Sequence, residues 1–145
     1  MADVVSTGEA FSSTDALREF WPVTVEVAVG TALIDVADRP GVAYTPSGGH
    51  VITKTVGPVT ISGFPDGGAS LDPLEVSVST DGTYEFPVTG ASASTPKSTK
   101  VYAVVAAGRI TELTLTVGTN KFFGIVNNPH DYVASASAIC VKIGV

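Results

Sequence analysis

The side chains that could carry chemistry in this chain are two histidines, one cysteine and fourteen carboxylates. His130 and Asp131 are adjacent, and Cys140 follows nine residues later. A Cys, His and Asp set can perform nucleophilic catalysis when the thiol is activated. Cys140, however, stands between Ile139 and Val141 on an expected strand, and apolar surroundings raise the pKa of a thiol and make it a poor nucleophile. We therefore expect a packed, structural thiol, which as the only cysteine has no partner for a disulfide within the chain.

Metal and glycosidase sites are not favoured by the remaining candidates. His50 and His130 belong to no metal-ligand spacing, and no second cysteine exists to complete a thiolate site. Carboxylate pairs for glycoside hydrolysis could be chosen from several acids, but any β-domain with fourteen acids offers such pairs. The acids from which such pairs could be chosen are Asp66, Asp72, Glu75, Glu85 and Glu112. We expect no catalytic residue, no metal and no cofactor, and hence a protein that is not an enzyme.

Length and composition indicate one all-β domain. The chain has 145 residues, of which 44% are hydrophobic and only 15% charged, and 15 are glycine. This composition suits strands joined by polar turns better than helices rich in Glu, Lys and Leu. The net charge is −6, with twelve acids and three bases in residues 1–90 against two acids and five bases in residues 91–145. Nucleic-acid binding is therefore not expected. The charge asymmetry is either chance or a sign of opposite-sign surfaces that meet between subunits or on a scaffold.

The beginning of the chain is not typical of a targeting segment. Residues 1–9 lack a basic start and an apolar stretch of signal-peptide length, and no segment approaches the ~20 apolar residues of a membrane span. We expect a protein that is made in the cytoplasm and has no membrane partner.

The clearest structural pattern runs from Leu74 to Val88. Apolar residues alternate with polar ones on both sides of Thr80-Asp81-Gly82, which predicts a β-hairpin with a three-residue loop closed by Gly82. Pairing residue 78 with 84, 76 with 86 and 74 with 88 puts all the apolar residues on one face. The other face would then be wet, and it would carry Glu75, Ser77, Thr83 and Glu85.

Period-two patterns and turn residues divide most of the chain into further short strands. A turn is expected at Asp38–Gly41, a loop at Ser62–Ser70 and a connector at Thr89–Thr99. The fold class that follows is all-β, a compact barrel or sandwich of about ten short, mostly antiparallel strands with an N-terminal arm. The other expected strands are Val23–Val29, Thr31–Val36, Val42–Thr45, His50–Val56, Val59–Ile61, Lys100–Val105, Arg109–Val117, Lys121–Val126 and Ser137–Ile143.

Residues 1–22 differ from the single β-domain expected over residues 23–145. They are polar and small except for a few large side chains, and Ser12–Asp15 could cap a short helix over Ala16–Phe20 that Pro22 would stop. The rings of this N-terminal arm either cover one end of the sheets or anchor the arm to a partner. As contacts with such a partner, or with another subunit, the hypothesis names Phe11, Leu17, Arg18, Phe20 and Trp21.

Three runs carry a resemblance to a known family. These are Glu75–Val88, with its strand, Thr-Asp-Gly turn and Phe-Pro step, Lys100–Thr111, which reads KVYAVVAAGRIT, and Thr119–Val126, which reads TNKFFGIV. Together they resemble the small capsid decoration proteins of tailed phages over about residues 59–145. Gly118-Thr119-Asn120 only approximates the family's third element, and residues 1–58 depart from its pattern.

The resemblance implies a structural virion protein, an all-β homotrimer made in the bacterial cytoplasm. Its partner would be the major capsid protein, on the outer surface of the assembled head, which it would stabilise. Such a role needs no catalytic group, because many weak contacts combine through avidity. The alternative from another class is a ligand- or host-binding β-sandwich, for carbohydrate binding or attachment, which an exposed aromatic row would favour.

Overall fold

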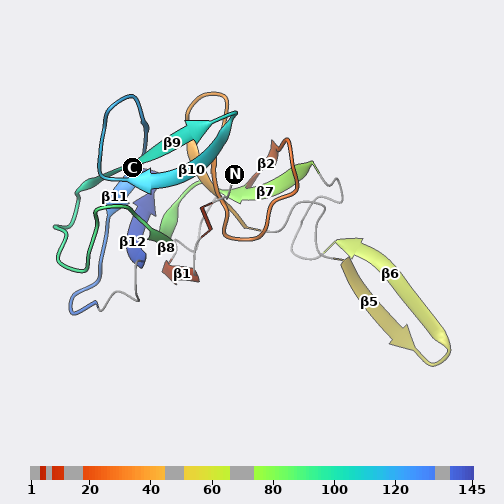
Figure 1. Cartoon of the computed structure of the whole chain (residues 1–145). Coiled ribbons are helices and arrows are strands. Elements are labelled where there is room, and N and C mark those ends of the chain that lie inside the picture. The colour runs from red at the N-terminus through yellow and green to blue at the C-terminus, as the bar shows by residue number, and fades with distance from the viewer. Residues whose placement is uncertain (1–3, 6–7, 12–17, 45–50, 66–73, 133–137) are drawn as a thin grey trace.

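The computed structural model describes residues 4–5, 8–11, 18–44, 51–65, 74–132 and 138–145. Within these residues the chain forms only β-strands, turns and irregular segments, as the composition predicts (Figure 1). The strands are β1 (Gly8–Phe11), β2 (Arg18–Pro22), β3 (Ala32–Ile34), β4 (Pro40–Ala43), β5 (Val51–Val56), β6 (Val59–Pro65), β7 (Glu75–Ser79), β8 (Gly82–Pro87), β9 (Lys100–Ala106), β10 (Arg109–Thr114), β11 (Lys121–Val126) and β12 (Ala138–Ile143).

The strands form three antiparallel sheets. The largest has six strands in the order β1-β8-β12-β11-β9-β10, and the second has four in the order β2-β7-β4-β3. Strands β5 and β6 pair only with each other. The expected all-β barrel or sandwich of short, mostly antiparallel strands is confirmed.

The main core lies between the six-stranded and the four-stranded sheets. Phe86 and Phe123 of the large sheet meet edge to face, with ring centroids 5.6 Å apart, and Val42 of β4 closes the cluster from the other side. A second apolar cluster lies on the opposite face of the four-stranded sheet, around Trp21 and Val78. Both faces of the four-stranded sheet, referred to below as the small sheet, are therefore covered.

The segment Leu74–Val88 is not a hairpin, contrary to the sequence prediction. Strand β7 pairs with β2 and β4, whereas β8 pairs with β12 and β1, so the turn at residues 80–81 carries the chain from one sheet to the other. The expected wet face is wrong as well, because Ser77 and Thr83 are buried. The Thr83 hydroxyl accepts a hydrogen bond of 3.0 Å from Asn127 Nδ2, so this buried polar group has a hydrogen-bond partner.

The strands of the second half of the chain lie where its pattern predicts them, with one shorter than expected. Strands β9 and β10 form a hairpin in which Ala107 and Gly108 both have positive φ angles, the geometry of a two-residue turn that matches strand twist. Strand β10 ends at Thr114, three residues before the expected end at Val117, and β11 has the predicted bounds. Strand β12 ends at Ile143 as expected, and Ser137, its expected first residue, lies outside the described part of the chain.

Two earlier expectations fail between residues 23 and 41. The alternating valines of Val23–Val29 form no strand. Val23 donates its backbone N–H to Leu74 O, and Val27 packs into the second cluster. The turn lies before Pro40 rather than at Asp38–Gly41, because Pro40 and Gly41 already belong to β4. Proline is tolerated as the first residue of a strand.

The described parts of the expected N-terminal arm belong to the two sheets. Strand β1 pairs with β8, β2 pairs with β7, and Val4 is buried in the main core. The helix expected over Ala16–Phe20 is wrong from Arg18 onward, because those residues pair with β7; its first two residues, like the Ser12–Asp15 cap, lie outside the described part of the chain.

Strands β5 and β6 form a hairpin that extends away from the two sheets (Figure 1). Gly57, with a φ of 59°, and Pro58 form its turn, as expected from the sequence. The expected loop at Ser62–Ser70 is wrong over its first four residues, which continue β6 to Pro65.

Candidate functional site

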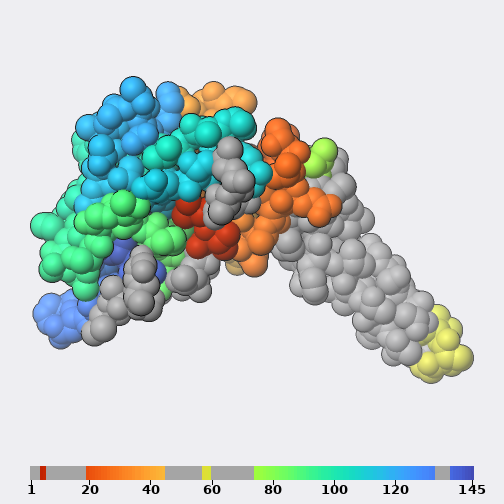
Figure 2. Space-filling model, in the orientation of Figure 1, coloured from red at the N-terminus to blue at the C-terminus, as the bar shows by residue number. Residues whose placement is uncertain are grey.

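An open groove of about 640 Å³ lies beside the second apolar cluster. One wall comes from residues 19–39 and the other from the β9–β10 turn. These two parts of the chain adjoin in Figure 2, where they are orange and cyan. The apolar residues that line it, and that define the groove from here on, are Phe20, Trp21, Pro22, Val23, Val25, Val27, Ala32, Leu33, Ile34, Val36, Val105 and Ile110.

The sole tryptophan forms the floor of the groove. Trp21 is buried and packs with Val76, Val78 and Ala43 on the face of the small sheet that lies away from the main core. Its indole Nε1 donates a hydrogen bond of 3.2 Å to Glu19 Oε1. A buried indole with its N–H satisfied gives the groove a rigid aromatic base.

One arginine ties the rim of the groove together. The guanidinium of Arg39 donates two hydrogen bonds to Glu19, of 2.9 and 3.1 Å, and its Nε donates one of 2.7 Å to Asp35 Oδ2. Its carbon Cζ lies 5.7 Å from the centroid of the Trp21 ring, within cation–π range. Arg39 thus connects β2 to the turn after β3 and lies over the indole.

The turn that carries Arg39 is organised by Asp35. Asp35 Oδ1 accepts hydrogen bonds from the backbone N–H groups of Ala37, at 2.8 Å, and Arg39, at 2.9 Å. An aspartate that bonds the backbone two and more residues ahead stabilises a tight turn. The same carboxylate therefore fixes both the backbone and the side chain of Arg39.

These contacts set the charge state of the rim. Hydrogen bonds from Arg39, and then from Trp21, hold the pKa of Glu19 below its usual value. For Asp35, partial burial raises the pKa, but the backbone and side-chain hydrogen bonds from Arg39 outweigh it and the net pKa is lowered. The pKa of Arg39 is raised by Glu19 and Asp35. Both carboxylates are therefore ionised at neutral pH and matched by one guanidinium.

The structure brings together two of the five predicted contact residues. Trp21 is on the floor of the groove, and Phe20, with 56% of its surface exposed, lies at its edge. Arg18 pairs with Ser79 and Phe11 with Thr83, which places them in different sheets, and their side chains lie outside the description. Leu17 lies outside the described residues.

Sequence reasoning missed the rest of the groove. The pattern of Asp35-Val36-Ala37-Asp38-Arg39 predicts only the end of a strand and a turn, although it contains an acid and an arginine four residues apart. Arg39 directly precedes β4, and it meets Glu19, twenty residues earlier, because β2 and β4 both pair with β7. No local pattern encodes that proximity.

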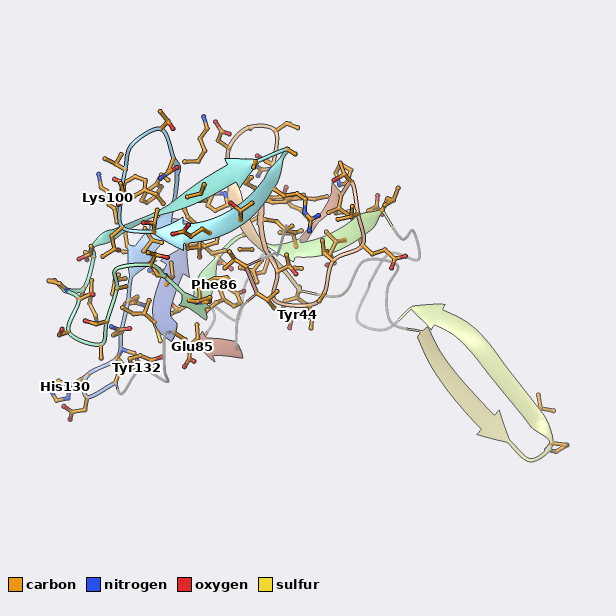
Figure 3. The ribbon with its side chains drawn as sticks, in the orientation of Figure 1. Tyr44, Glu85, Phe86, Lys100, His130 and Tyr132 are labelled. Atoms are coloured by element: carbon orange, nitrogen blue, oxygen red, sulfur yellow. The ribbon has the colours of Figure 1, made fainter. Side chains whose placement is uncertain are left out.

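The residues first considered for catalysis differ in their exposure to solvent. Cys140 is fully buried on β12, as expected, whereas the His130 side chain is 92% exposed beside Asp131, with Nδ1 3.0 Å from Asp131 Oδ2. Burial raises the pKa of the Cys140 thiol; the nearby Tyr132 hydroxyl lowers it in part and the Glu85 carboxylate raises it further. Figure 3 shows Glu85 and Tyr132 pointing toward one another.

The fold and groove define an all-β domain with an open apolar surface at the edge of its smaller sheet. Comparisons with known proteins find no matching family model, no similar curated protein and no similar solved structure. In the part of the chain that the structure describes, no helix is long and apolar enough to cross a membrane.

Proposed function

We propose that this protein is a structural virion protein that binds the outer surface of an assembled bacteriophage capsid and stabilises it. The observation that supports this proposal is the groove. Phe20, Val25 and Val36 are all exposed on it, next to a rigid aromatic floor. Apolar surface that gathers in one place and is rimmed by charged residues is characteristic of protein contact sites.

The resemblance of the sequence to capsid decoration proteins adds to this support. Its first run corresponds to β7 and β8, its second to β9 with the first half of β10, and its third to β11. These strands contribute to both sheets of the sandwich. A decoration protein needs a rigid body with contact surfaces, and the partners would be the major capsid protein and further copies of the chain in a homotrimer. The site of action would be the outer face of the virion.

Electron microscopy of mixed components tests the proposal. Purified protein is added to undecorated capsids of the phage that encodes it, and regular density is expected at local three-fold positions. Phe20→Asp should lower occupancy at least about tenfold, since a charge in an apolar contact leaves an unpaired desolvated group. Val117→Asp is the matched control, because Val117 is 57% exposed and does not line the groove.

Point variants are preferable to removing the N-terminal segment. A deletion of residues 1–21 would take away β1 and most of β2, which are strands of the two sheets. Loss of capsid binding by this deletion variant would then not distinguish a lost contact from a lost fold. Capsids that stay bare with the intact protein, or equal occupancy for both variants, would contradict the proposal.

The size of the groove favours a second candidate, a carbohydrate-binding or attachment module. Ligand pockets commonly measure ≈ 300–1,000 Å³ and are lined by aromatic and apolar residues, and the volume here lies in that range. Because Trp21 is the sole tryptophan, saccharide binding in the groove would change the intrinsic fluorescence. A saturable change with a sugar, absent for Phe20→Asp, would favour this candidate over capsid binding.

A further inference from the structure

The outer face of the six-stranded sheet, the side turned away from the main core, is covered by the chain itself over β8 and β12. The segment that follows β11 lies there. Asn127 Nδ2 donates a hydrogen bond to the Thr83 hydroxyl. Asn128 Oδ1 accepts one of 3.0 Å from the backbone N–H of Cys140. Both Thr83 and Cys140 are buried, so this half of the outer face is closed to a ligand.

The other half of the outer face carries exposed side chains over β9, β11 and the end of β12. Lys100 of β9 is opposite Ile125 of β11, and Ile125 is opposite Lys142 of β12, so the three side chains form a row on one face. The row points outward, because the neighbouring residues Val101 and Val141 belong to the main core. Both lysines are exposed, and their Cα atoms lie roughly 10 Å apart at the usual strand spacing.

An aromatic pair lies beside this row. Tyr102, two residues after Lys100, shares its face and is opposite Phe122 of β11. The two rings meet edge to face, with centroids 6.2 Å apart and planes at 75°. Phe122 has 37% of its surface exposed, so apolar ring surface is available directly beside the lysines. The residues Lys100, Tyr102, Phe122, Ile125 and Lys142 are referred to below as the lysine–aromatic face.

The lysine–aromatic face has an unbalanced positive charge. Within the part of the chain that the structure describes, neither lysine takes part in an ion pair. Among the acids of the outer face, Glu85 lies in the covered half, where Tyr132 points toward it (Figure 3). Glu112 is opposite Val104, four residues along β9 from Lys100, and thus about 13 Å from the lysine row. An anionic ligand is therefore attracted to this face.

The chemistry of the face selects among anionic partners. Nucleic acids bind through many phosphate contacts, and a protein of net charge −6 that presents two lysines here offers too few of them. Protein interfaces are depleted of lysine, whereas lysines flank the middle of this row. An acidic saccharide matches the face better, because its carboxylates accept hydrogen bonds from ammonium groups and the C–H faces of its rings pack on aromatic side chains. Alternate sugar units of an extended chain are spaced much like the two lysines.

From these observations we infer that the lysine–aromatic face binds an acidic saccharide, one whose sugar units carry carboxylate groups. Each ammonium group holds one carboxylate, and a sugar ring packs on the exposed side of Phe122. The groove adjoins the face of the small sheet that is turned away from the main core, so the two surfaces lie on opposite sides of the sandwich. Saccharide binding here is therefore separate from the capsid contact, and a subunit seated by its groove keeps this face free.

A nuclear magnetic resonance titration of the full chain tests for this ligand and locates it. Oligomers of galacturonic acid and of sialic acid are the probes, and at least one should cause saturable shifts of backbone amides in β9, β11 and β12. The double variant Lys100→Gln and Lys142→Gln should raise the dissociation constant at least about tenfold, since two charge-assisted hydrogen bonds are lost. Lys97→Gln is the matched control and should leave the constant unchanged, because it removes an exposed lysine outside the face.

A second variant and a second probe separate the aromatic contribution from the charged one. Phe122→Ala should raise the dissociation constant at least about threefold, because the ring contact is lost while both lysines remain. Its amide spectrum away from β9 and β11 should match that of the intact protein, which shows that the fold is kept. Methyl-esterified oligogalacturonate keeps the sugar rings and loses the charges, so it should bind at least about tenfold more weakly than the acid.

Several results would overturn the inference. These are the absence of saturable shifts with both acidic oligomers, an affinity that the double lysine variant leaves unchanged or that Lys97→Gln lowers equally, and equal binding of the methyl ester. Tighter binding of oligothymidylate or of an oligoglutamate peptide than of either saccharide would also overturn it, and would assign the face to a nucleic acid or to an acidic protein segment.

Discussion

Gly41 of β4 lies directly beneath the indole of Trp21. A Cβ atom added at this glycine would be 2.7 Å from Cη2 of the ring and would also overlap Cγ1 of Val78. Both neighbours are buried in the second apolar cluster and have little room to move. The absence of a side chain at residue 41 therefore allows the tryptophan to lie flat enough to form the floor of the groove.

Gly41→Ala should destabilise the protein and displace Trp21. Overpacking a dense cluster typically costs 1–3 kcal/mol of unfolding free energy, so urea unfolding should shift by roughly that amount. Because Trp21 is the sole tryptophan, its emission spectrum reports the displacement directly. Gly90→Ala is the control: nothing lies within 4 Å of a Cβ there, so it should leave the emission unchanged despite its backbone strain. Unchanged emission for Gly41→Ala would refute the packing argument.

The ion-pair network at the rim predicts a pH-dependent contribution to stability. The pKa values of Glu19 and Asp35 are lowered in the folded protein from usual values of 4.5 and 3.8. A lowered folded-state pKa stabilises the protein above the unfolded-state pKa, and that stabilisation is lost as the pH falls through the folded-state pKa. The contribution of the network should therefore be complete at pH 7 and be lost progressively as the pH falls below the usual values of 4.5 and 3.8.

Arg39→Met isolates this contribution. The variant should be less stable than the intact protein at pH 7, and the difference should shrink when urea unfolding is repeated at pH 3, where the carboxylates are becoming protonated. Lys97→Met is the control, because it removes an exposed charge in the connector. Its stability difference from the intact protein should not shrink between pH 7 and pH 3. A difference that is the same at both pH values would mean that Arg39 acts through packing on Trp21 alone.

Sequence patterns identified most strands but not which strands pair. Alternation along Leu74–Val88 assigns side chains to faces, and it fits a hairpin and a turn between two sheets equally well. The observed turn depends on Ser77 and Thr83 being buried, which their polar character argued against. Small hydroxyl residues tolerate burial when they find partners, as Thr83 does in Asn127.

The groove was predictable only in part, for a related reason. Phe20 and Trp21 were singled out because aromatic residues in a polar segment need an explanation, and both prove to line the groove. The remaining wall comes from the β9–β10 turn, some eighty residues later in the chain. The alternation along Val23–Val29 predicts a strand that does not form. It instead reflects two environments, because Val23 and Val27 pack in the cluster around Trp21 while Val25 is exposed in the groove.

Two adjacent phenylalanines on β11 should differ strongly in their effect on stability. Phe123 is fully buried against Phe86, whereas Phe122 lies on the outer face beside Tyr102, with ring centroids 6.2 Å apart. Phe123→Ala should cost about 3–5 kcal/mol of unfolding free energy, the usual range for a buried phenylalanine. Phe122→Ala should cost about 0.5–1.5 kcal/mol, since mainly the aromatic pair is lost. Equal losses in urea unfolding would place the main core elsewhere.

Cys140 should be unreactive until the protein unfolds. The thiol is fully buried on β12, and its pKa is raised chiefly by that burial, so little thiolate exists near neutral pH and no reagent reaches it. Labelling with a chromogenic disulfide reagent should be at least about a thousandfold slower in buffer than in concentrated urea, because opening of a core strand requires close to the full unfolding free energy. Val145→Cys supplies a matched exposed thiol in the same chain, at the residue after Gly144, and should add one rapid equivalent under native conditions. A rapid equivalent from the intact protein itself would show that β12 opens readily, and with it the centre of the six-stranded sheet.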